Sequence, residues 1–445
     1  DCFINISEYG NNLKKYVTYS LKCDFKTEKQ FVDFYRITFM PLNENLLKSY
    51  QFNESLYIVE QLMDYTTHRF DMGLAKSYCL LSYAIAQYFA GNYYEALKNG
   101  SSAYEYFKNF LGDTHPDTLK AMQVLIIAYR RTGRYQLSLS LSQELYKLRE
   151  QINGPNHPST IDESINLAIS YRKTGNYKEA IKILEKVLAY RIAEMGEEHP
   201  STIGVLSSLA NAYRQSGDNI HACQLSEKVV KLRTQVYGEN HLSTLAAMGS
   251  LAHSYRLVGK YDLATELSEK VVRARCEILG EDHPLTLRAM NNLANSYRKI
   301  GRYDEALHYA EKVVNHRIQI LGENHPSTIG ALSNLATSYR MLHQFEKAHS
   351  IALKVYEWRH EKYGEKHPAT LRAMNNLVNS YKKMGKNDEA QLLLESLIKL
   401  TNNVYGPKHP STLAAIHNLS HDNLIDIDEE DSEDVVEESY ELLMH

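Results

Sequence analysis

The sequence predicts an all-α protein in which helical hairpins stack side by side into a solenoid. Three observations support this prediction: a fixed period, two apolar helix stripes per period, and glycine or proline at each boundary. The period is 42 residues, and a fixed period of this length is typical of a stacked helical array. A histidine marks every unit, and the series spans (409 − 115)/42 = 7 periods without an insertion or deletion: His115, His157, His199, His241, His283, His325, His367 and His409.

Residues 280–321 illustrate the two helices expected in each unit. The first stripe recurs at helix spacing, through Leu287, Met290, Leu293, Ala294 and Tyr297. A glycine then ends this helix A, because glycine adopts the left-handed conformation without penalty. The second stripe defines helix B, through Tyr303, Ala306, Leu307, Ala310, Val313, Val314 and Ile318. Helix A should have about four turns and helix B about five.

The linker between units should stop one helix and start the next. Gly322 ends helix B, and Pro326 prevents its continuation. Ser327 or Thr328 is expected to cap the following helix A by accepting backbone N–H bonds. The histidine should pack and hydrogen-bond within this linker. Small residues at one position of helix A should let neighbouring helices approach closely, at Ala168, Ala210, Ala252, Ala294 and Ala336.

The string L-A-x-x-Y-x-x-x-G-x-Y-x-x-A resembles the tetratricopeptide repeat (TPR). The 42-residue period and the LG-E-x-HP-x-T linker resemble its kinesin-light-chain subclass, over roughly residues 73–421. The resemblance implies a right-handed superhelical solenoid of TPR hairpins. Heptads are absent from residues 1–72, so the coiled coil that precedes these repeats in kinesin light chains is missing, and we do not expect a kinesin light chain proper.

The predicted organisation has three parts. Residues 1–72 lack the period and are rich in aromatic residues, so we expect a helical N-terminal cap or the end of a truncated upstream domain. Residues 73–421 form the solenoid, with a degenerate unit at 73–114, seven units at 115–408 and a half-unit cap at 409–421. Departures from the repeat pattern are interpreted as local costs in stability, at Asn219, Leu242, His343 and Asn387.

Residues 422–445 form an acidic tail. Residues 421–445 contain 11 of the 54 acidic residues and no Lys or Arg. The rest of the chain therefore has 50 basic and 43 acidic residues, a net charge of 50 − 43 = +7. Charge blocks of this kind are commonly disordered interaction tails. One hypothesis is that the tail occupies the binding groove of its own or a neighbouring molecule, and the alternative is a solubilising tail. A short helix over 435–444 could instead cover the last repeat, since Val436, Tyr440 and Leu443 share a helix face.

Composition and motifs argue against an enzyme, a cofactor or a metal site. Stacked repeats lie about 9–10 Å apart, too far for the eight histidines to share one ion. Nucleotide-binding, zinc-protease and serine-hydrolase motifs are absent. Glu269 and Glu311 are interpreted as solvated or intra-repeat carboxylates. The five scattered cysteines and the lack of an 18-residue apolar run favour a reducing, cytoplasmic location without a membrane partner. The start lacks Met and a signal-peptide pattern, which we interpret as a fragment or a processed N-terminus.

The candidate binding residues lie on helix A. In TPR arrays, the helix A residues beside the small position line the concave surface. In this register a cation occurs in every full unit, and in five of the seven units Asn, His or Thr lies three residues before it. Asn offers a donor and an acceptor to a peptide backbone, and guanidinium binds carboxylates. The predicted peptide-binding set is Arg172, Asn211, Arg214, His253, Arg256, Asn291, Asn295, Arg298, Lys299, Arg340, Asn375, Asn379 and Lys382. Alternatively, each cation complements the end of its helix or pairs with a neighbouring Glu in a structural ladder.

The predicted function is a non-enzymatic adaptor scaffold that binds short, acidic linear motifs in the concave groove. This ligand class is what the resemblance to kinesin-light-chain-like grooves implies. An alternative is a ligand-sensing array at the C-terminus of a larger signalling protein or enzyme. A third hypothesis is a self-associating structural array. Nucleic acid is not expected, because helix A lacks aromatic residues interleaved with basic ones for base stacking.

Overall fold

Every regular element in the described part of the chain is helical, which confirms the predicted fold class. The computed structural model describes residues 15, 17, 25–48, 52–69, 73–407 and 410–420. The tail and the marker His409 therefore lie outside the described residues. The described residues fall into two compact units that divide between Glu163 and Ser164, within one helix. The predicted domain boundaries at 72/73 and 421/422 stay predictions.

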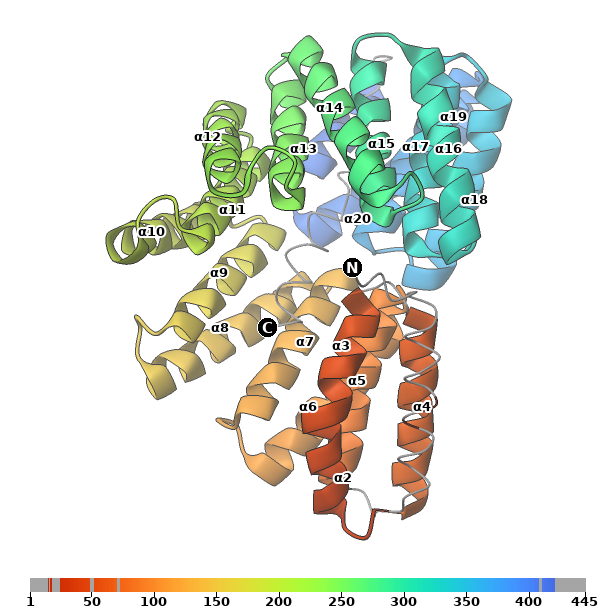
Figure 1. The fold of residues 1–445 in the computed structure, drawn as a ribbon. Coiled ribbons are helices and arrows are strands. Elements are labelled where there is room, and N and C mark those ends of the chain that lie inside the picture. Colours follow the sequence, from red (N-terminus) through yellow and green to blue (C-terminus); the bar gives the residue numbers. More distant parts are fainter. Residues whose placement is uncertain are drawn as a thin grey trace. The chain divides into compact units, whose positions relative to one another are not determined.

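Helices of two kinds alternate along the chain (Figure 1). The A helices are α5 (Leu74–Phe89), α7 (Pro116–Arg131), α9 (Pro158–Lys173), α11 (Pro200–Ser216), α13 (Leu242–Leu257), α15 (Pro284–Lys299), α17 (Pro326–Met341), α19 (Pro368–Lys383) and α21 (Pro410–Ser420). The B helices are α6 (Tyr93–Leu111), α8 (Tyr135–Asn153), α10 (Tyr177–Met195), α12 (Asn219–Tyr237), α14 (Tyr261–Leu279), α16 (Tyr303–Leu321), α18 (Phe345–Tyr363) and α20 (Asn387–Tyr405). The expected lengths of about four and five turns are confirmed.

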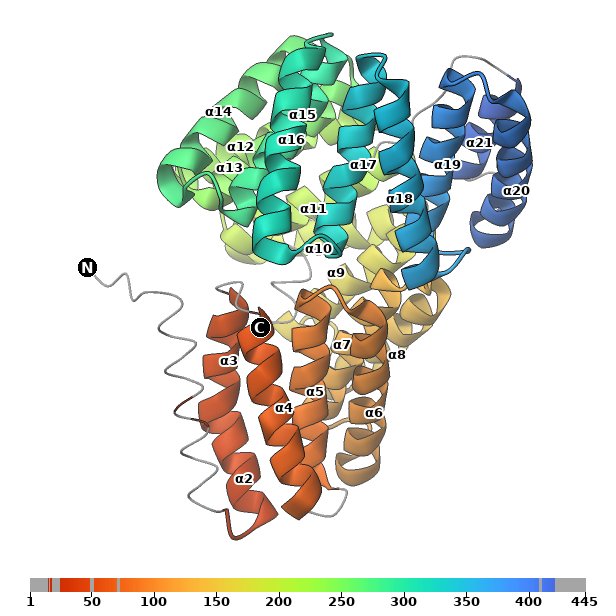
Figure 2. The same ribbon diagram turned by 90° about the vertical axis from the view of Figure 1, so that its right-hand side faces the viewer.

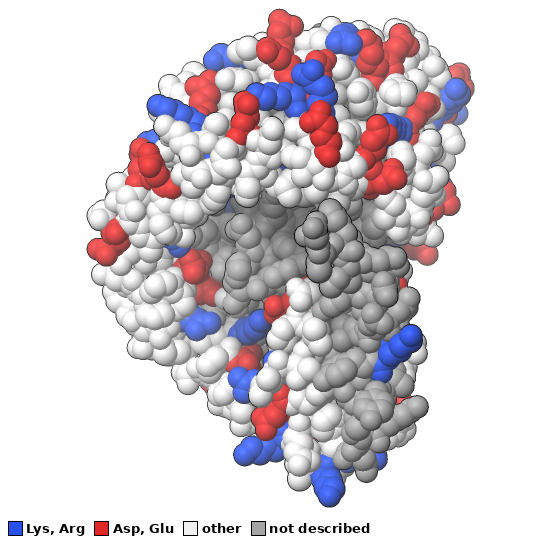
Figure 3. All heavy atoms as spheres, in the orientation of Figure 1, with Lys and Arg blue, Asp and Glu red and all other residues white. Residues whose placement is uncertain are grey.

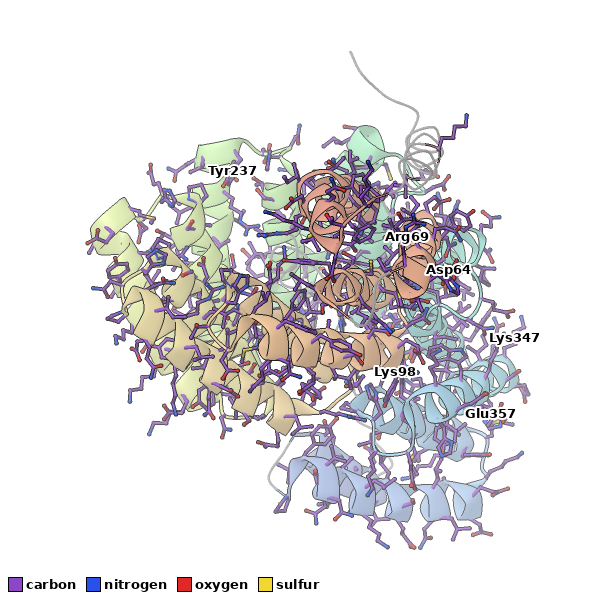
Figure 4. The ribbon with its side chains drawn as sticks, turned by 90° about the horizontal axis from the view of Figure 1, so that it is seen from below. Asp64, Arg69, Lys98, Tyr237, Lys347 and Glu357 are labelled. Carbon is purple, nitrogen blue, oxygen red and sulfur yellow. The ribbon has the colours of Figure 1, made fainter. Side chains whose placement is uncertain are left out.

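The N-terminal region packs against the first of these hairpins. It consists of α2 (Glu28–Phe34), a π-helical turn η1 (Tyr35–Phe39), α3 (Met40–Lys48) and α4 (Phe52–Arg69), with α4 beside α5 (Figure 2). Burial of aromatic side chains holds it there. Tyr35 is fully buried, with its ring 4.9 Å from Phe39 and 6.0 Å from Tyr78 of α5. The surface of α4 is polar, and Arg69 (Figure 4) lies over the Tyr65 ring.

From His115 to His367, each linker is organised by its histidine, whose side chain caps the N-terminus of the following helix A. The Nδ1 atom of His283 accepts a hydrogen bond from the backbone N–H of Leu285 at 3.2 Å, and His367 accepts one from Ala369 at 3.1 Å. The predicted packing and bonding of the linker histidines is therefore confirmed. The expectation that Ser or Thr caps the helix is wrong. The threonine points backward instead, and Thr244 donates to the carbonyl oxygen of Gly238 at 2.8 Å.

A buried arginine on helix B fastens the same linker, and the sequence analysis missed it. Arg275 Nη1 donates to the carbonyl oxygen of Leu285 at 2.6 Å, and Arg317 donates to that of Ser327 at 2.7 Å. The same bond recurs from Arg233 to Ser243 and from Arg359 to Ala369. The guanidinium is thereby a second donor to a carbonyl oxygen in the first turn of helix A, which also lies in the intrahelical ladder, and it ties the preceding helix B to the start of helix A. The arginine recurs every 42 residues, which is the signal that would have revealed it.

One turn departs from the glycine rule as the sequence analysis expected. His343 stands where the glycine between the helices occurs in other units, and its φ is 58°. The glycines at this position, such as Gly301 with a φ of 79°, adopt the same left-handed conformation. A side chain with a Cβ atom is strained there. The substitution therefore carries a local cost in stability.

Candidate functional site

The candidate site lies on the A helices of the second unit. Successive A helices pack directly on one another, as α13 on α15, α15 on α17 and α17 on α19. The B helices α12, α14, α16 and α18 lie toward the outside of this unit (Figure 1). We define the A-helix face as the polar side chains of α11, α13, α15, α17 and α19 from the eighth to the sixteenth residue after each linker histidine. This is the surface that the sequence analysis proposed for ligand binding.

The A helices of the second unit carry no negative charge. Helices α11, α13, α15, α17, α19 and α21 contain neither Asp nor Glu, although they contain six Arg and three Lys. The acidic residues of this unit lie on B helices and linkers. On the side shown in Figure 3, acidic and basic side chains are interspersed over the upper helices. The A helices therefore form the part of the unit with charge of a single sign.

The predicted cations link each A helix to the next. Arg298 is buried and donates to the Asn334 carbonyl oxygen at 3.1 Å and to Asn295 Oδ1 at 2.6 Å. Arg256 Nη1 donates to Ser296 Oγ at 3.1 Å, and Lys382 donates to the Asn418 carbonyl oxygen. These contacts correspond to a structural ladder, although its acceptors are hydroxyl and carbonyl groups rather than the Glu residues considered from the sequence.

Exposure divides the predicted set into two groups. Six members are buried, each at most 8% exposed: Arg172, Arg214, Asn291, Arg298, Asn375 and Asn379. Six are half-buried: Asn211, His253, Arg256, Asn295, Arg340 and Lys382. Lys299 is exposed. The half-buried and exposed members are the ones that a ligand on this face would contact.

Two of the buried asparagines connect neighbouring A helices. Asn334 Nδ2 donates to Asn291 Oδ1 at 2.9 Å, and Asn418 Nδ2 donates to Asn375 Oδ1 at 3.0 Å. A related bond runs from Asn376 to Ser333 at 3.2 Å. Buried amides in such a network fix the register of packed helices. A shift of one helix along the other would break these bonds and leave buried polar groups without a partner or water, which is costly. Asn291 and Asn375 therefore have a packing role that the sequence analysis did not assign to them.

Three cations from different A helices surround His253. Arg214 of α11 places Nη1 3.2 Å from His253 Nδ1 and also donates to Asn211. Because arginine has no acceptor, the imidazole accepts this bond and is neutral. Burial lowers the pKa of His253 well below its usual value, and the charges of Arg214, Arg256 and Lys299 lower it further. Helices α11, α13 and α15 thus contribute cations to one place on the A-helix face.

The helix A tyrosines bond to glutamates of the preceding hairpin. Tyr297 donates to Glu269 at 2.8 Å and Tyr339 donates to Glu311 at 2.6 Å. The intra-repeat alternative for Glu269 and Glu311 is therefore wrong, since each bond joins two repeats, although the Glu269 side chain is still 37% exposed to solvent. A lysine covers the second tyrosine, since Lys347 (Figure 4) lies 5.2 Å from the centre of the Tyr339 ring. These carboxylates face the B helices and leave the A-helix face free of acidic groups.

The described residues include no group of three or more His, Cys, Asp or Glu side chains arranged to hold a metal ion. No helix within the described ranges is long and apolar enough to cross a membrane.

Comparison with known families identifies the class of this repeat. The tetratricopeptide repeat model matches residues 76–151, 125–193, 159–222, 201–277, 250–319, 285–357 and 327–402. The chain belongs to the tetratricopeptide repeat family, and as an array of these repeats it is a protein-interaction scaffold. Arrays of this fold are typically non-catalytic. No curated protein matches the sequence.

Solved structures show two kinds of similarity. A putative kinesin light chain from Podosopora anserina, with nearly identical TPR-like repeats, is 30% identical over 46% of this chain and 97% of its own, with a TM-score of 0.40. The predicted similarity to kinesin-light-chain-like repeats is thereby confirmed. A Rap protein complexed with competence and sporulation factor is 9% identical, with coverage of 82% and 98% and a TM-score of 0.53. The quorum sensor NprR from B. thuringiensis is 16% identical, with coverage of 80% and 96% and a TM-score of 0.50. The last two share the fold alone.

Proposed function

We propose that the protein is an adaptor that binds short acidic linear motifs of partner proteins on its A-helix face. The observation that carries this proposal is the single sign of charge on that face: its helices contain Arg and Lys but no Asp or Glu. An acidic segment would meet no like charge there. Surfaces of one sign raise the local concentration of an oppositely charged ligand and speed its association.

The proposed contacts differ in kind along the face. Exposed Lys299 and half-buried Arg256 flank His253 and would attract carboxylates of the ligand. Half-buried Asn211 and Asn295 would hydrogen-bond to its backbone, since an amide supplies both a donor and an acceptor. Arg298 and Asn291 are buried between helices and would hold the face in shape. The solved complex of a Rap protein with competence and sporulation factor supports the idea that this fold accommodates a bound factor.

The proposal is tested with the full chain and a labelled peptide of residues 422–433, DNLIDIDEEDSE, as an acidic probe. Fluorescence anisotropy should show saturable binding that weakens as the salt concentration rises, because screening reduces attraction between exposed charges. The Lys299→Glu variant should bind at least about tenfold more weakly, since reversal of a charge at a contact costs more than about 1.4 kcal/mol.

Lys312→Glu is the matched control, with the same change of charge on helix B, where Lys312 pairs with Glu281 at 2.6 Å. Its affinity should stay within about twofold of wild type, because that side does not contact the ligand. Equal weakening in both variants would show that only net charge matters and would contradict the assignment to the A-helix face. Equal binding of a peptide with Asn and Gln in place of its acids would contradict the acidic specificity.

A further inference from the structure

The last A helix of the array exposes three apolar side chains in one stripe. In α21, Leu413 is 52% exposed, Ile416 44% and Leu419 47%. These residues are three apart, so they lie on one side of the helix and form a continuous strip. Single exposed apolar residues are common, whereas a strip of three on one helix face marks a contact surface.

The same three positions are buried in the other A helices of the second unit from α11 onward. Forty-two residues earlier in α19, Leu371, Met374 and Leu377 are each 3% exposed or less. The equivalent side chains of α11, α13, α15 and α17 are all buried: Ile203, Leu206, Leu209, Leu245, Met248, Leu251, Leu287, Met290, Leu293, Ile329, Leu332 and Leu335. In each of these hairpins the following B helix packs against helix A, as α20 does against α19.

On its other side α21 sits like an internal A helix. It packs on α20, and Asn418 donates to Asn375 with the geometry that Asn334 uses toward Asn291 (Figure 2). Lys382 reaches the Asn418 carbonyl oxygen, as Arg298 reaches that of Asn334. The register of the array is therefore kept at α21. Within the described residues, no helix covers this apolar strip in the position that a B helix occupies in the other repeats.

Residues 429–445 have the pattern of a B helix when the 42-residue period is continued. They lie outside the described residues, so the comparison is one of sequence. The buried positions Ala390, Leu394, Leu400 and Thr401 of α20 correspond to Ser432, Val436, Leu442 and Leu443. The half-buried Leu393 and Ile398 correspond to Val435 and Tyr440. The exposed Leu392, Glu395 and Lys399 correspond to Asp434, Glu437 and Glu441. Apolar residues thus fall on the inner side and acids on the outer side, apart from Ser439 in the place of buried Leu397.

Two details strengthen this register. Serine is already used at the small position, because Ser138 of α8 is buried and donates to the Ile126 carbonyl oxygen of its own hairpin at 3.1 Å. When the period is continued, Ser432 takes the position of Ser138 and the carbonyl group of Ser420 takes the position of the Ile126 carbonyl. In addition, Glu429, Glu430 and Asp431 fall in the first turn of the helix in this register. Negative charge is favourable there because of the helix dipole.

We propose that the apolar strip of α21 is the docking site of residues 429–445, which pack on it as the B helix of a ninth hairpin. In this arrangement Asp434, Glu437 and Glu441 lie on the outer side of the new helix. The same residues cannot pack on α21 and occupy the A-helix face at once. The ninth hairpin therefore leaves the A-helix face available to a partner.

Hydrogen exchange of the full chain, followed by mass spectrometry over residues 410–420, tests the proposal. The Val436→Lys/Leu443→Lys variant places charge on the docked side of the helix. It should speed exchange of α21 amides at least tenfold, because α21 would lose its cover and fray. The matched control is Glu437→Gln/Glu441→Gln, with the same change of two charges on the outer side, and it should exchange like wild type.

Ile416→Ser, on the other half of the contact, should speed exchange in residues 435–445 if the two segments pack together. Unchanged exchange of both segments in the two inner-side variants would overturn the proposal. Equal effects of the inner and outer tail variants would also overturn it, because the tail would then act through its charge alone. A dimer in light-scattering measurements that Ile416→Ser abolishes would show that a second copy covers the strip. None of these outcomes depends on binding of an acidic peptide.

Discussion

The A and B helices of the second unit are built from the same repeat but use their charges in opposite ways. On the A helices the charges are of one sign, and the buried or half-buried Arg214, Arg256 and Arg298 hydrogen-bond to the next A helix. On the B helices both signs occur. Apart from the buried arginines that fasten the linkers, these charges form pairs at the surface, as between Lys312 and Glu281 of the preceding linker. A charged residue can therefore recur with the same period on both helices and have a different physical role on each.

This difference shows how one face can be stable and still able to bind. The buried cations of the A helices have acceptors within the protein, so the positive face is assembled before any ligand arrives. Such preorganisation reduces the entropic cost of binding. On the B helices, exposed ion pairs contribute little and leave a surface of balanced charge.

Removal of a buried A-helix cation should reduce the free energy of unfolding much more than removal of a B-helix cation that forms a surface ion pair. Arg298→Ala removes bonds to the Asn334 carbonyl oxygen and to Asn295, together with the packing of a buried side chain. We expect a loss of about 2–4 kcal/mol. Lys312→Ala should change stability by less than about 0.5 kcal/mol. Urea denaturation followed by circular dichroism measures both, and similar shifts in the two variants would contradict the contrast.

Acid should destabilise the A-helix face through His253, an effect of intermediate size. Burial and three cations hold the pKa of His253 below its unfolded value, so the unfolded chain binds the proton more readily. Stability contributed by the neutral imidazole is present at pH 7.5 and lost as the pH falls through about 6.5. Asparagine occupies this position in α11 and α15, so His253→Asn is a mild variant.

The thermal midpoint should therefore fall less between pH 7.5 and 5.5 in His253→Asn than in wild type. Other histidines titrate equally in the two proteins, so the difference between them reports His253 alone. If the thermal midpoint depends on pH equally in the wild-type protein and in the variant, the imidazole of His253 is not held neutral by its neighbours.

The smallest effect concerns the B-helix ion pairs. A double-mutant cycle on Lys312 and Glu281, with alanine at either or both positions, should give a coupling of about 0.2–1 kcal/mol at low salt. It should be nearly abolished in 1 M salt, where the Debye length is about 3 Å. A larger coupling free energy that is unchanged in 1 M salt would mean that this ion pair stabilises the fold as strongly as the cations of the A helices do.

The sequence analysis predicted the helices well because their signals are local. The 42-residue period, the glycine after each helix and the proline that starts helix A each act on the backbone within a few residues. The linker histidine was recognised as structural for the same reason. Its role as the N-cap was missed, since Ser and Thr are the residues usually found there.

The roles of charged side chains were predicted less well because they depend on the neighbouring unit. Glu269 has no sequence feature that reveals Tyr297 of the next hairpin as its donor. Arg275 and Arg298 recur with one period, yet one fastens a linker and the other joins two A helices. Packing decides which of these side chains remain accessible to a ligand.

The amino-acid sequence alone therefore determined the all-α repeat, its period, the ends of its helices and the positive character of helix A, because each depends on residue type and local spacing. Only the tertiary structure decided which cations are buried, that Arg214, Arg256 and Lys299 gather around His253, and that α21 presents an apolar strip. These features arise where helices from successive repeats meet. Contacts between repeats are set by packing in three dimensions rather than by the order of residues.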